Sequence, residues 1–130
     1  MAITERQRRG AWAEDVAADH LLNLGWRVLA RNVRVGRDEI DLLCLDPGPP
    51  AELAFVEVRG VRHPGFGAPE ERVDRRKVGH LYRAMAALVR TGRLPGAGEL
   101  PRLAARVDLL LVDGRGPTVQ LRHLRRLQPP

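Results

Sequence analysis

Cysteine, aromatic side chains and long apolar runs are all scarce in this sequence. Cys44 is the only cysteine, which excludes a disulfide within the chain and favours a reducing compartment. With two Trp, two Phe and one Tyr, the core must consist mainly of Leu, Val and Ala. No apolar run approaches the roughly 18 residues of a membrane span, and the start has no apolar stretch of signal-peptide length. These absences predict a cytoplasmic chain with no membrane partner.

Lysine is scarce as well, because Lys77 is the only lysine in a chain that is rich in arginine. The 22 basic residues exceed the 16 acidic ones, which gives a formal net charge of +6. A basic excess of this kind favours a polyanionic partner such as nucleic acid. It could also serve solubility alone, and abundant Ala, Gly, Pro and Leu suggest a GC-rich genome that enriches arginine without selecting for its chemistry.

Helical periodicity and stop signals predict two helices. Thr4 followed by Gln7 fits a capping box, and Gly25 is a natural stop, so the first helix should span about residues 5–24. Asp74 can cap a second helix, which Gly92 should end. Runs rich in β-formers predict strands at residues 26–33, 39–45, 52–59, 105–112 and 118–124, with loops at 60–72 and 93–101 and a frayed tail.

The order of these elements, α-β-β-β-α-β-β, predicts the fold class. Residues 47–50 form a Pro/Gly turn between two strands, which implies an antiparallel hairpin. Residues 105–112 are apolar almost throughout, as in a strand buried on both faces. Helices separated by a strand meander indicate an α/β fold with a mixed central sheet and helices packed on it, not a doubly wound fold. We expect a single domain over residues 1–130, with its core at about 5–124.

Strand alternation brings acidic residues together in the predicted hairpin. Asp41 follows Glu39 on one face of its strand, and Arg59 follows Glu57 on one face of the next strand. Asp41 and Glu57 would then lie within reach of each other. Adjacent carboxylates repel, and a divalent cation such as Mg²⁺ relieves the conflict while taking up water and phosphate oxygens. Arg59 beside them could neutralise the charge that develops on a phosphodiester under attack.

A plainer interpretation of the same residues stays open. They could form the solvated face of an amphipathic hairpin with Glu–Arg cross-strand pairs, because an Asp followed at a distance by Glu-x-Arg is common by chance. The four histidines show no metal-ligand spacing, and Cys44 is typical of a core residue. Trp12 and Trp26 are interpreted as helix–sheet packing residues rather than base-stacking platforms.

Five sequence blocks in a fixed order resemble a known family over about residues 8–124. They are the helix block GAWAED, the N-x-R strand in NVR, the strand EIDL, the strand FVEVR, and the FG…RRK segment that leads into the second helix. Together they resemble the YraN-like family of small uncharacterised bacterial proteins, a group of predicted endonucleases. That family is similar to archaeal Holliday-junction resolvases, so the resemblance implies the restriction-endonuclease-like PD-(D/E)XK fold.

The resemblance also implies roles for particular residues. Asp41 matches the acid of the PD half, and Glu57 with Arg59 matches the (D/E)XK half. Glu14 matches the acid of the first helix, and Lys77 matches the basic residue that opens the second helix. In this group of folds the acids, here Asp41, Glu57 and Glu14, hold Mg²⁺ (or Mn²⁺), and a lysine assists the attacking water.

Two positions depart from the family pattern. Asp38 stands where the family usually has glycine, and Arg59 stands where the motif has lysine. Arginine stays protonated and cannot act as a general base, although it can bind phosphate in a bidentate manner. One explanation is neutral drift from lysine to arginine. Another is that Lys77 supplies the missing ammonium group from the second helix.

Arginines gather at both helix starts and at the C-terminus. The residues expected to bind nucleic acid are Arg34, from the N-x-R block, and Arg72, Arg75 and Arg76, from the start of the second helix. Further basic clusters comprise Arg6, Arg8, Arg9, Arg83, Arg122, Arg125 and Arg126. No base-reading motif accompanies them, so recognition of backbone or shape is expected.

Two functions therefore remain open. The first is a Mg²⁺-dependent endonuclease that cleaves phosphodiester bonds in DNA, including branched or structured DNA. The second is a non-catalytic nucleic-acid-binding or adaptor module on the same fold, which the Arg59 departure favours. DNA is the preferred partner in both cases. A homodimer is expected only by analogy with junction resolvases, which act on substrates of two-fold symmetry.

Overall fold

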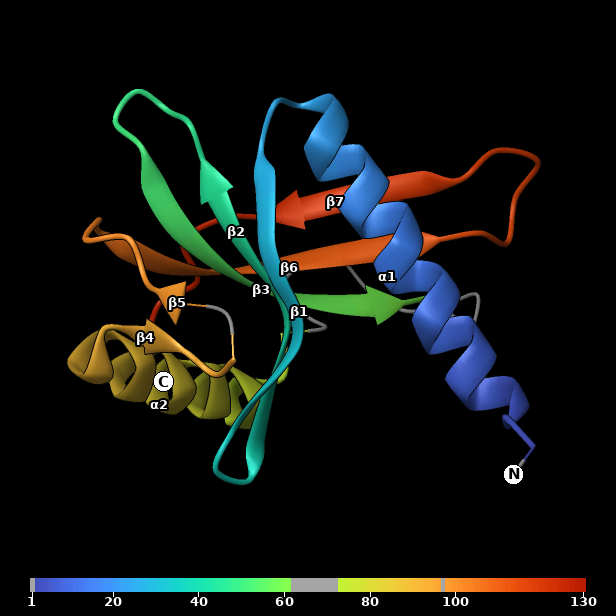
Figure 1. Ribbon diagram of the computed structural model, residues 1–130. Helices are drawn as coiled ribbons and strands as arrows, with labels where there is room; N and C mark the ends of the chain where they lie inside the picture. Colours follow the sequence, from blue (N-terminus) through green and yellow to red (C-terminus); the bar gives the residue numbers. More distant parts are fainter. Residues whose placement is uncertain (1, 62–72, 97) are drawn as a thin grey trace.

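Two helices and a five-stranded sheet make up most of the described structure (Figure 1). A computed structural model describes residues 2–61, 73–96 and 98–130. The helices are α1 (Glu5–Asn23) and α2 (Arg75–Thr91), and the main strands are β1 (Arg27–Val35), β2 (Asp38–Asp46), β3 (Glu52–Gly60), β6 (Ala105–Asp113) and β7 (Gln120–Leu124). Two short strands, β4 (Arg93–Leu94) and β5 (Gly98–Glu99), pair within a segment predicted to be loop. The predicted order of the main elements is otherwise confirmed.

Both helices begin and end at the residues that the sequence indicated, within one position. Gln7 N–H donates to Thr4 Oγ1 at 3.1 Å, and Thr4 N–H donates to Gln7 Oε1 at 2.9 Å, which completes a capping box. The Asp74 carboxylate accepts backbone N–H groups from the first turn of α2, including that of Lys77 at 3.3 Å. Gly92 ends α2 with a φ of 70°, which glycine adopts without strain. Neither helix of the described segments is long and apolar enough to cross a membrane.

The main sheet has the strand order β1-β2-β3-β6-β7. β1 with β2, β2 with β3, and β6 with β7 are antiparallel, whereas β3 and β6 are parallel. A parallel pair needs a crossover connection, and the segment containing α2 supplies it. Residues 106–112 of β6 are all buried, as predicted for a strand covered on both faces. The sheet is therefore mixed, as predicted.

The two helices cover opposite faces of the sheet, so the core has two halves. On the α1 side, Ala17 and Leu21 pack with Leu42, Val56 and Leu110. On the α2 side, the buried core residues include Leu81, Ala84, Leu88, Leu43, Phe55 and Val107. The core is almost entirely aliphatic, as the composition required, and Cys44 is fully buried within it.

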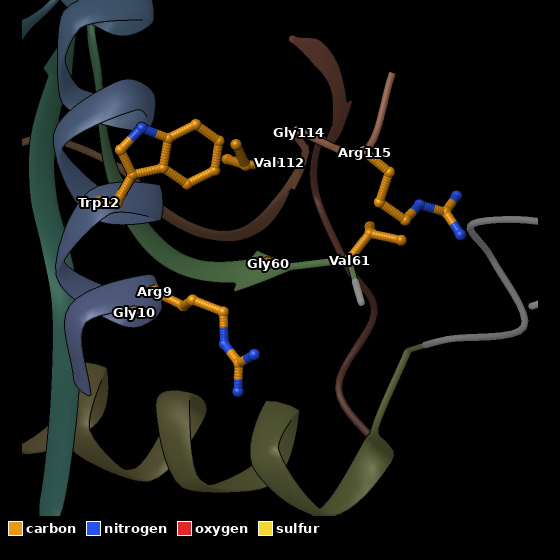
Figure 2. A pocket seen from close by; sticks show the side chains of 8 residues that line it. All are labelled: Arg9, Gly10, Trp12, Gly60, Val61, Val112, Gly114 and Arg115. Carbon is orange, nitrogen blue, oxygen red and sulfur yellow. The ribbon is translucent and has the colours of Figure 1, made fainter. Parts of the chain in front are cut away.

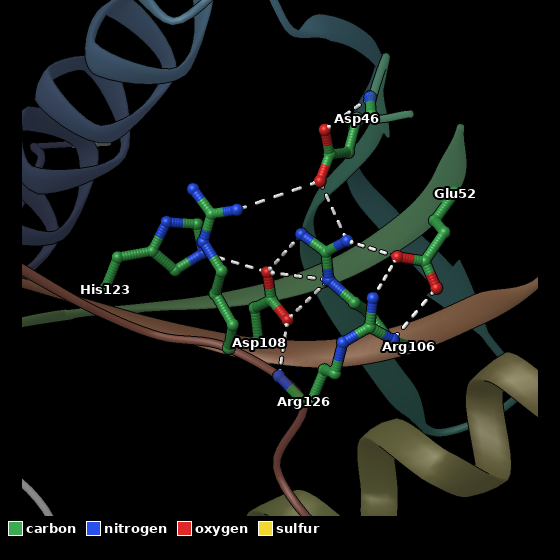
Figure 3. Close-up of polar contacts among 8 residues, drawn as sticks. Asp46, Glu52, Arg106, Asp108, His123 and Arg126 are labelled. Carbon is green, nitrogen blue, oxygen red and sulfur yellow. Dashed lines mark hydrogen bonds and ion pairs between the residues drawn. The ribbon is translucent and has the colours of Figure 1, made fainter. Parts of the chain in front are cut away.

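A buried ionic network ties together one end of the sheet (Figure 3). Arg106 is 5% exposed, and its Nη1 lies 2.8 Å from Asp46 Oδ2 and 3.0 Å from Glu52 Oε1. Its Nε lies 3.1 Å from Asp108 Oδ1, and Asp108 is fully buried. Asp108 also lies 2.8 Å from the imidazole Nε2 of His123 and accepts the backbone N–H of Arg126 at 3.0 Å. The network joins β2, β3, β6 and β7 at the end of the sheet where β2 ends and β3 begins.

The C-terminal tail is bound rather than frayed, which corrects the prediction from the sequence. Leu127 N–H donates to Val107 O at 2.9 Å, as if extending the sheet. Tyr82 of α2 donates its hydroxyl to Leu127 O at 2.6 Å. Arg75 also reaches the tail, donating to Pro129 O at 3.4 Å. In Figure 1 the C-terminus accordingly lies against α2.

Candidate functional site

Asp41 lies at a break in the alternation of β2. Ile40 packs in the core half under α2, whereas Leu42 packs in the half under α1. Residues two apart in a regular strand share a face, so the strand changes its facing at Asp41. In the β1–β2 ladder, the residues on either side of Asn32 pair with the residues on either side of Asp41, so Asn32 lies opposite Asp41. Asn32 has a left-handed φ of 51°. Asparagine tolerates this conformation better than most residues, so the distortion has a local cause.

The break directs Asp41 towards β3. Val58 N–H donates to Asp41 Oδ2 at 2.8 Å, so the side chain takes the place of a backbone acceptor. The β2–β3 ladder pairs Leu42 with Val56, and one further step would set Asp41 across from Glu57. This extension of the hairpin register sets the two acids near each other, although the alternation from which the sequence predicted it breaks at Asp41.

Burial perturbs both carboxylates. Burial raises the pKa of Asp41 above its ordinary value, and the charge of Glu39 adds to the rise, against the opposing hydrogen bond from Val58. Burial also raises the pKa of Glu57, whose side chain is only 16% exposed, and the charge of Asp41 acts in the same direction. Lys77 and Arg59 oppose both rises by favouring the charged forms. Each acid is thus held partly desolvated beside the other.

Two cations approach these acids from different elements. Lys77, in the first turn of α2, places its Nζ 3.8 Å from Glu57 Oε1. Arg59, two residues after Glu57 on β3, places Nη2 3.7 Å from Oδ2 of Asp74, the residue that caps α2. Asp74 therefore holds the start of α2 next to the end of β3. The hypothesis that Lys77 supplies an ammonium group to this site agrees with its position.

Glu14 of α1 is the third acid near this point. Burial raises the pKa of Glu14, and the nearby charge of Asp41 adds to the rise. Arg31 and a hydrogen bond from the Asn32 side chain act in the opposite direction. Arg31 is also paired with Asp15, one residue further along α1, at 2.6 Å. We call Glu14, Asp41 and Glu57 the acid cluster.

The acid cluster is a loose arrangement of donors. Among the described residues, no group of three or more His, Cys, Asp and Glu side chains is arranged to hold a metal ion. Asp41 and Glu57 still offer partly desolvated carboxylate oxygens, which are the donors that Mg²⁺ takes one or two at a time with water and phosphate. The cluster can therefore take up positive charge at low cost, and Lys77 supplies part of it.

The residues predicted to bind nucleic acid are spread more widely. Arg75 and Arg76 are exposed at the start of α2, beside Lys77. Arg34 is exposed on β1, where its ladder partner is Glu39. Arg72 lies outside the described residues. The structure thus sets Arg75 and Arg76 in the first turn of α2 with Lys77, and Arg34 along the β1–β2 hairpin.

Arg83 and Asp38, which the sequence analysis considered separately, form an ion pair. Arg83 Nε and Nη2 donate to the two oxygens of Asp38 at 2.8 and 2.7 Å, in a bidentate pair. The family departure at Asp38 is thus matched by a cation on α2. Arg83 was grouped with the basic cluster at the start of α2, but its charge is balanced by this carboxylate.

Asn32 is a residue of the site that the sequence reasoning missed. It stands across from Asp41 and donates to Glu14, so it links β1, β2 and α1 at the acid cluster. Only Arg34 of the N-x-R block was carried over as functional. The available signal was the asparagine itself, a residue enriched at left-handed backbone positions, inside a run of β-formers.

Comparison with known proteins identifies the family. The family described as "Uncharacterised protein family UPF0102" matches residues 13–112. A UPF0102 protein of Halorhodospira halophila is 42% identical over 108 residues, which cover 83% of this chain and 79% of the relative. A UPF0102 protein of Deinococcus radiodurans is 38% identical over 116 residues, 89% of each chain. A third, from a Mycobacterium species, is 38% identical over 125 residues, 95% of this chain and 87% of the relative. The chain therefore belongs to the UPF0102 family, as its YraN-like sequence blocks indicated.

Proposed function

We propose that this protein is a metal-dependent endonuclease that cleaves phosphodiester bonds in DNA, with branched or structured DNA as the preferred substrate class. The observation that carries the proposal is the convergence of Glu14, Asp41 and Glu57 with Lys77 at one place on the sheet. Partly buried like charges with raised pKa values are costly for stability. Such perturbed groups are concentrated at functional sites.

The carboxylates are donors of the kind that bind a magnesium or manganese ion. Asp41 and Glu57 would hold it, because one or two carboxylates suffice when water and substrate phosphate complete the shell. Glu14 would contribute a third oxygen or orient a bound water. When bound, such an ion supplies an activated water and offsets charge on the phosphodiester.

The basic residues would act on the substrate. Arg59 is always protonated, so it would bind a phosphate oxygen pair rather than accept a proton. Lys77 would hold the attacking water or the scissile phosphate from the start of α2. Arg75 and Arg76, exposed beside it, would bind the flanking phosphates of the strand. These roles position the phosphodiester over the acid cluster, with no contact that reads a base.

A restriction-endonuclease-like fold is part of this proposal. It is supported by the position of Asp41 on β2 and of Glu57-Val58-Arg59 on the neighbouring strand β3, with α1 carrying Glu14 before them. This is the arrangement that the PD-(D/E)XK resemblance requires. The mixed sheet with a helix on each face is compatible with it.

The test is cleavage of labelled single-stranded, duplex, flap and four-way-junction DNA by purified protein with Mg²⁺ or Mn²⁺. Asp41→Asn and Glu57→Gln remove charge with little change of shape, and both should abolish cutting while binding persists. Glu99→Gln, at an exposed acid outside the cluster, is the matched control and should cut like wild type. Cutting that survives in both cluster variants would refute the proposal.

The second candidate is a nucleic-acid-binding module without cleavage. Two observations favour it: Arg59 stands at the lysine position, and no preformed group of three metal-binding side chains occurs among the described residues. In that case the same assay gives binding without cutting under any metal. Asp41→Asn would then leave binding unchanged or strengthen it, because repulsion of phosphate falls.

A further inference from the structure

A hollow of about 270 Å³ lies between the first half of α1 and the ends of β3 and β6 (Figure 2). Its walls include Arg9 and Trp12 of α1, Gly60 at the end of β3, Val112 of β6, and Gly114 and Arg115 just after β6. It is slightly smaller than the roughly 300–1,000 Å³ typical of sites for whole cofactors or drug-sized ligands. Its size suits a smaller planar group.

Trp12 is held in this hollow while much of it stays exposed. A Cβ atom added to Gly114 would lie 2.5 Å from Trp12 Cη2, so the six-membered ring edge rests directly on the backbone there. The residue is nonetheless 43% exposed, in contrast to Trp26, which is 4% exposed. The sequence predicted packing roles for both tryptophans, and only Trp26 is buried accordingly. A fixed, half-exposed indole is a surface on which a planar ring can stack.

Two arginines, Arg9 and Arg115, line the same hollow as the indole. Figure 2 shows the guanidinium of Arg9 directed away from α1 beside Gly60, and that of Arg115 beyond Val61. Arg115 is paired with Asp113, with both Nε and Nη2 at 2.9 Å from carboxylate oxygens, so its charge is largely balanced. None of the ion pairs found within the described residues involves Arg9. Arg9 is therefore the better placed of the two to bind an anion.

The hollow and the acid cluster share two elements. Gly10 precedes Glu14 by about one turn of α1, which is about 6 Å at 1.5 Å per residue. Gly60 follows Glu57 by three residues, which is about 10 Å along β3. A stacked nucleic-acid strand advances about 3.4 Å per nucleotide. The hollow is thus about two nucleotides from Glu14 along α1. Glu57 is farther from it, because Phe55 packs under α2 and Val58 packs on the α1 side, so Glu57 lies on the α2 face of β3.

We propose that the hollow binds an unpaired nucleotide, with its base stacked on Trp12 and its phosphate bound by Arg9. The aromatic face, the two arginines and the net charge of +6 favour a nucleotide over an apolar peptide or a neutral ligand. Stacking on an aromatic side chain tolerates any base, which agrees with the lack of base-reading motifs. The path from hollow to acid cluster rests on the proposed nuclease function, whereas nucleotide binding at Trp12 does not. The substrate class is then DNA with a single-stranded portion, such as a flap or a frayed branch.

The test is equilibrium binding of a fluorescent oligothymidylate in EDTA, where cleavage cannot intervene. A stacked base contributes about 1–3 kcal/mol by alanine substitution, which converts to a roughly 5- to 150-fold loss of affinity for Trp12→Ala. Trp12→Phe should keep most of the affinity. Arg9→Gln should weaken binding and reduce its salt dependence. Leu22→Ala, at another exposed apolar residue of α1, and Arg102→Gln, at an exposed arginine outside the basic clusters, are the matched controls and should bind like wild type.

A second readout guards against misfolding of the variants. Stacking should quench the fluorescence of Trp12 in wild type when oligothymidylate is added. Trp12→Phe retains only the buried Trp26, so its emission should not respond although it still binds. An oligothymidylate affinity that is the same in wild type and Trp12→Ala, or no change in wild-type emission on binding, would overturn the proposal.

Failure of this inference can be told apart from failure of the proposed function. If Trp12-dependent binding occurs but no metal supports cutting, the nucleotide site stands and the nuclease proposal falls. If wild type cuts DNA and Trp12→Ala binds and cuts equally well, the nuclease stands and the nucleotide site falls. Asp41→Asn should retain Trp12-dependent binding, because its charge is not part of the hollow.

Discussion

At the scale of single residues, the chemistry of the acid cluster depends on which cation lies beside Glu57. Lys77 reaches Glu57 from α2 at 3.8 Å, whereas Arg59 extends from the same strand towards Asp74 at 3.7 Å. An ammonium group is compact and can exchange a proton when its surroundings demand it, but a guanidinium cannot. The two residues are therefore not interchangeable in the proposed reaction.

We predict that Lys77→Ala lowers the cleavage rate by about 10²–10³-fold, the usual effect of removing one charge-stabilising donor. Arg59→Lys should retain activity, because it restores a cation that can still bind phosphate. Single-turnover cleavage of the best DNA substrate measures both. Full activity in Lys77→Ala, together with complete loss in Arg59→Ala, would show that the motif position and not α2 carries the essential cation.

The raised pKa of Glu57 makes a second prediction at this scale. An acid whose pKa is raised by folding destabilises the native state once it ionises. The penalty is absent below the ordinary pKa of a glutamate, and is complete above the raised pKa of the folded state. Glu57→Gln removes the charge, so it should be more stable than wild type at neutral pH, by about 1.4 kcal/mol for each unit by which the pKa is raised.

Urea unfolding of wild type and Glu57→Gln as a function of pH measures this effect. The difference in unfolding free energy should shrink as the pH falls towards the ordinary pKa of a glutamate. Glu99→Gln, at an exposed acid, is the matched control. A Glu57→Gln variant that is less stable than wild type at neutral pH would mean that its pairing with Lys77 outweighs its burial.

At the scale of elements, the acids of the network around Arg106 have lowered pKa values, whereas those of the acid cluster have raised pKa values. Burial alone would raise the pKa of Asp108, but hydrogen bonds from His123 and Arg106 hold that pKa below its ordinary value. The strongest single influence on Glu52 is its hydrogen bond from Arg126, which lowers the pKa of Glu52. Acids with lowered pKa values stabilise the fold above their unfolded-state pKa and lose this contribution as the pH falls through the folded-state pKa. The end of the sheet that holds this network should therefore weaken in acid.

We predict that Arg106→Met destabilises the protein by about 3–5 kcal/mol, because it leaves buried carboxylates without their shared cation. Arg115→Met removes a more exposed pair with Asp113 and should cost less than about 1 kcal/mol. Urea unfolding at neutral pH compares them. If Arg106→Met is too unstable to purify, acidification of wild type should unfold this end first, with loss of amide protection in β7. Equal costs for the two variants would show that the network does not stabilise the fold.

Helices and strands could be predicted from the sequence where the residues that determine them are close together in the chain. The capping box at Thr4, the cap at Asp74 and the stop at Gly92 are local signals, and the helices follow them. The short β4–β5 pair was missed because two-residue strands carry no periodicity. The bound tail was missed because its partners, Val107 and Tyr82, are distant in sequence.

The candidate site was predictable in part for the same reason. Alternation and the tight turn were enough to bring Asp41 and Glu57 together. Neither signal could show that β2 changes its facing at Asp41, or that Asn32 donates to Glu14 from the opposite strand. The proximity of Lys77 to Glu57 came from the family resemblance and not from spacing, since a crossover of unknown path separates them.

At the scale of the whole molecule, only part of the positive charge is available to bind a polyanion. Some arginines of the basic clusters are paired with acids within the fold, including Arg83 with Asp38 and Arg126 with Glu52. Arg75 and Arg76 remain exposed at the start of α2, in the same turn as Lys77. The surface that attracts a polyanion should therefore be narrower than the composition suggests, and centred on the start of α2.

We predict that this distribution sets the salt dependence of DNA binding. Each phosphate neutralised by a cation contributes about 0.7 to the slope of log affinity against log salt for single strands, and about 0.9 for duplex. Arg75→Gln and Arg76→Gln should each reduce the slope by about that amount. Arg83→Gln should leave the slope unchanged although it also removes one positive charge, because that charge already belongs to Asp38.

Including Arg83→Gln shows whether DNA binding depends on the position of each positive charge or only on the net charge. If binding responded only to net charge, the three substitutions would reduce affinity alike, and the salt slopes would shift together. If the slope falls for Arg75→Gln and Arg76→Gln alone, the strand passes over the start of α2, where Lys77 and Glu57 meet. A slope that changes for Arg83→Gln instead would place the strand along the β1–β2 hairpin, beside Asp38, and away from the acid cluster.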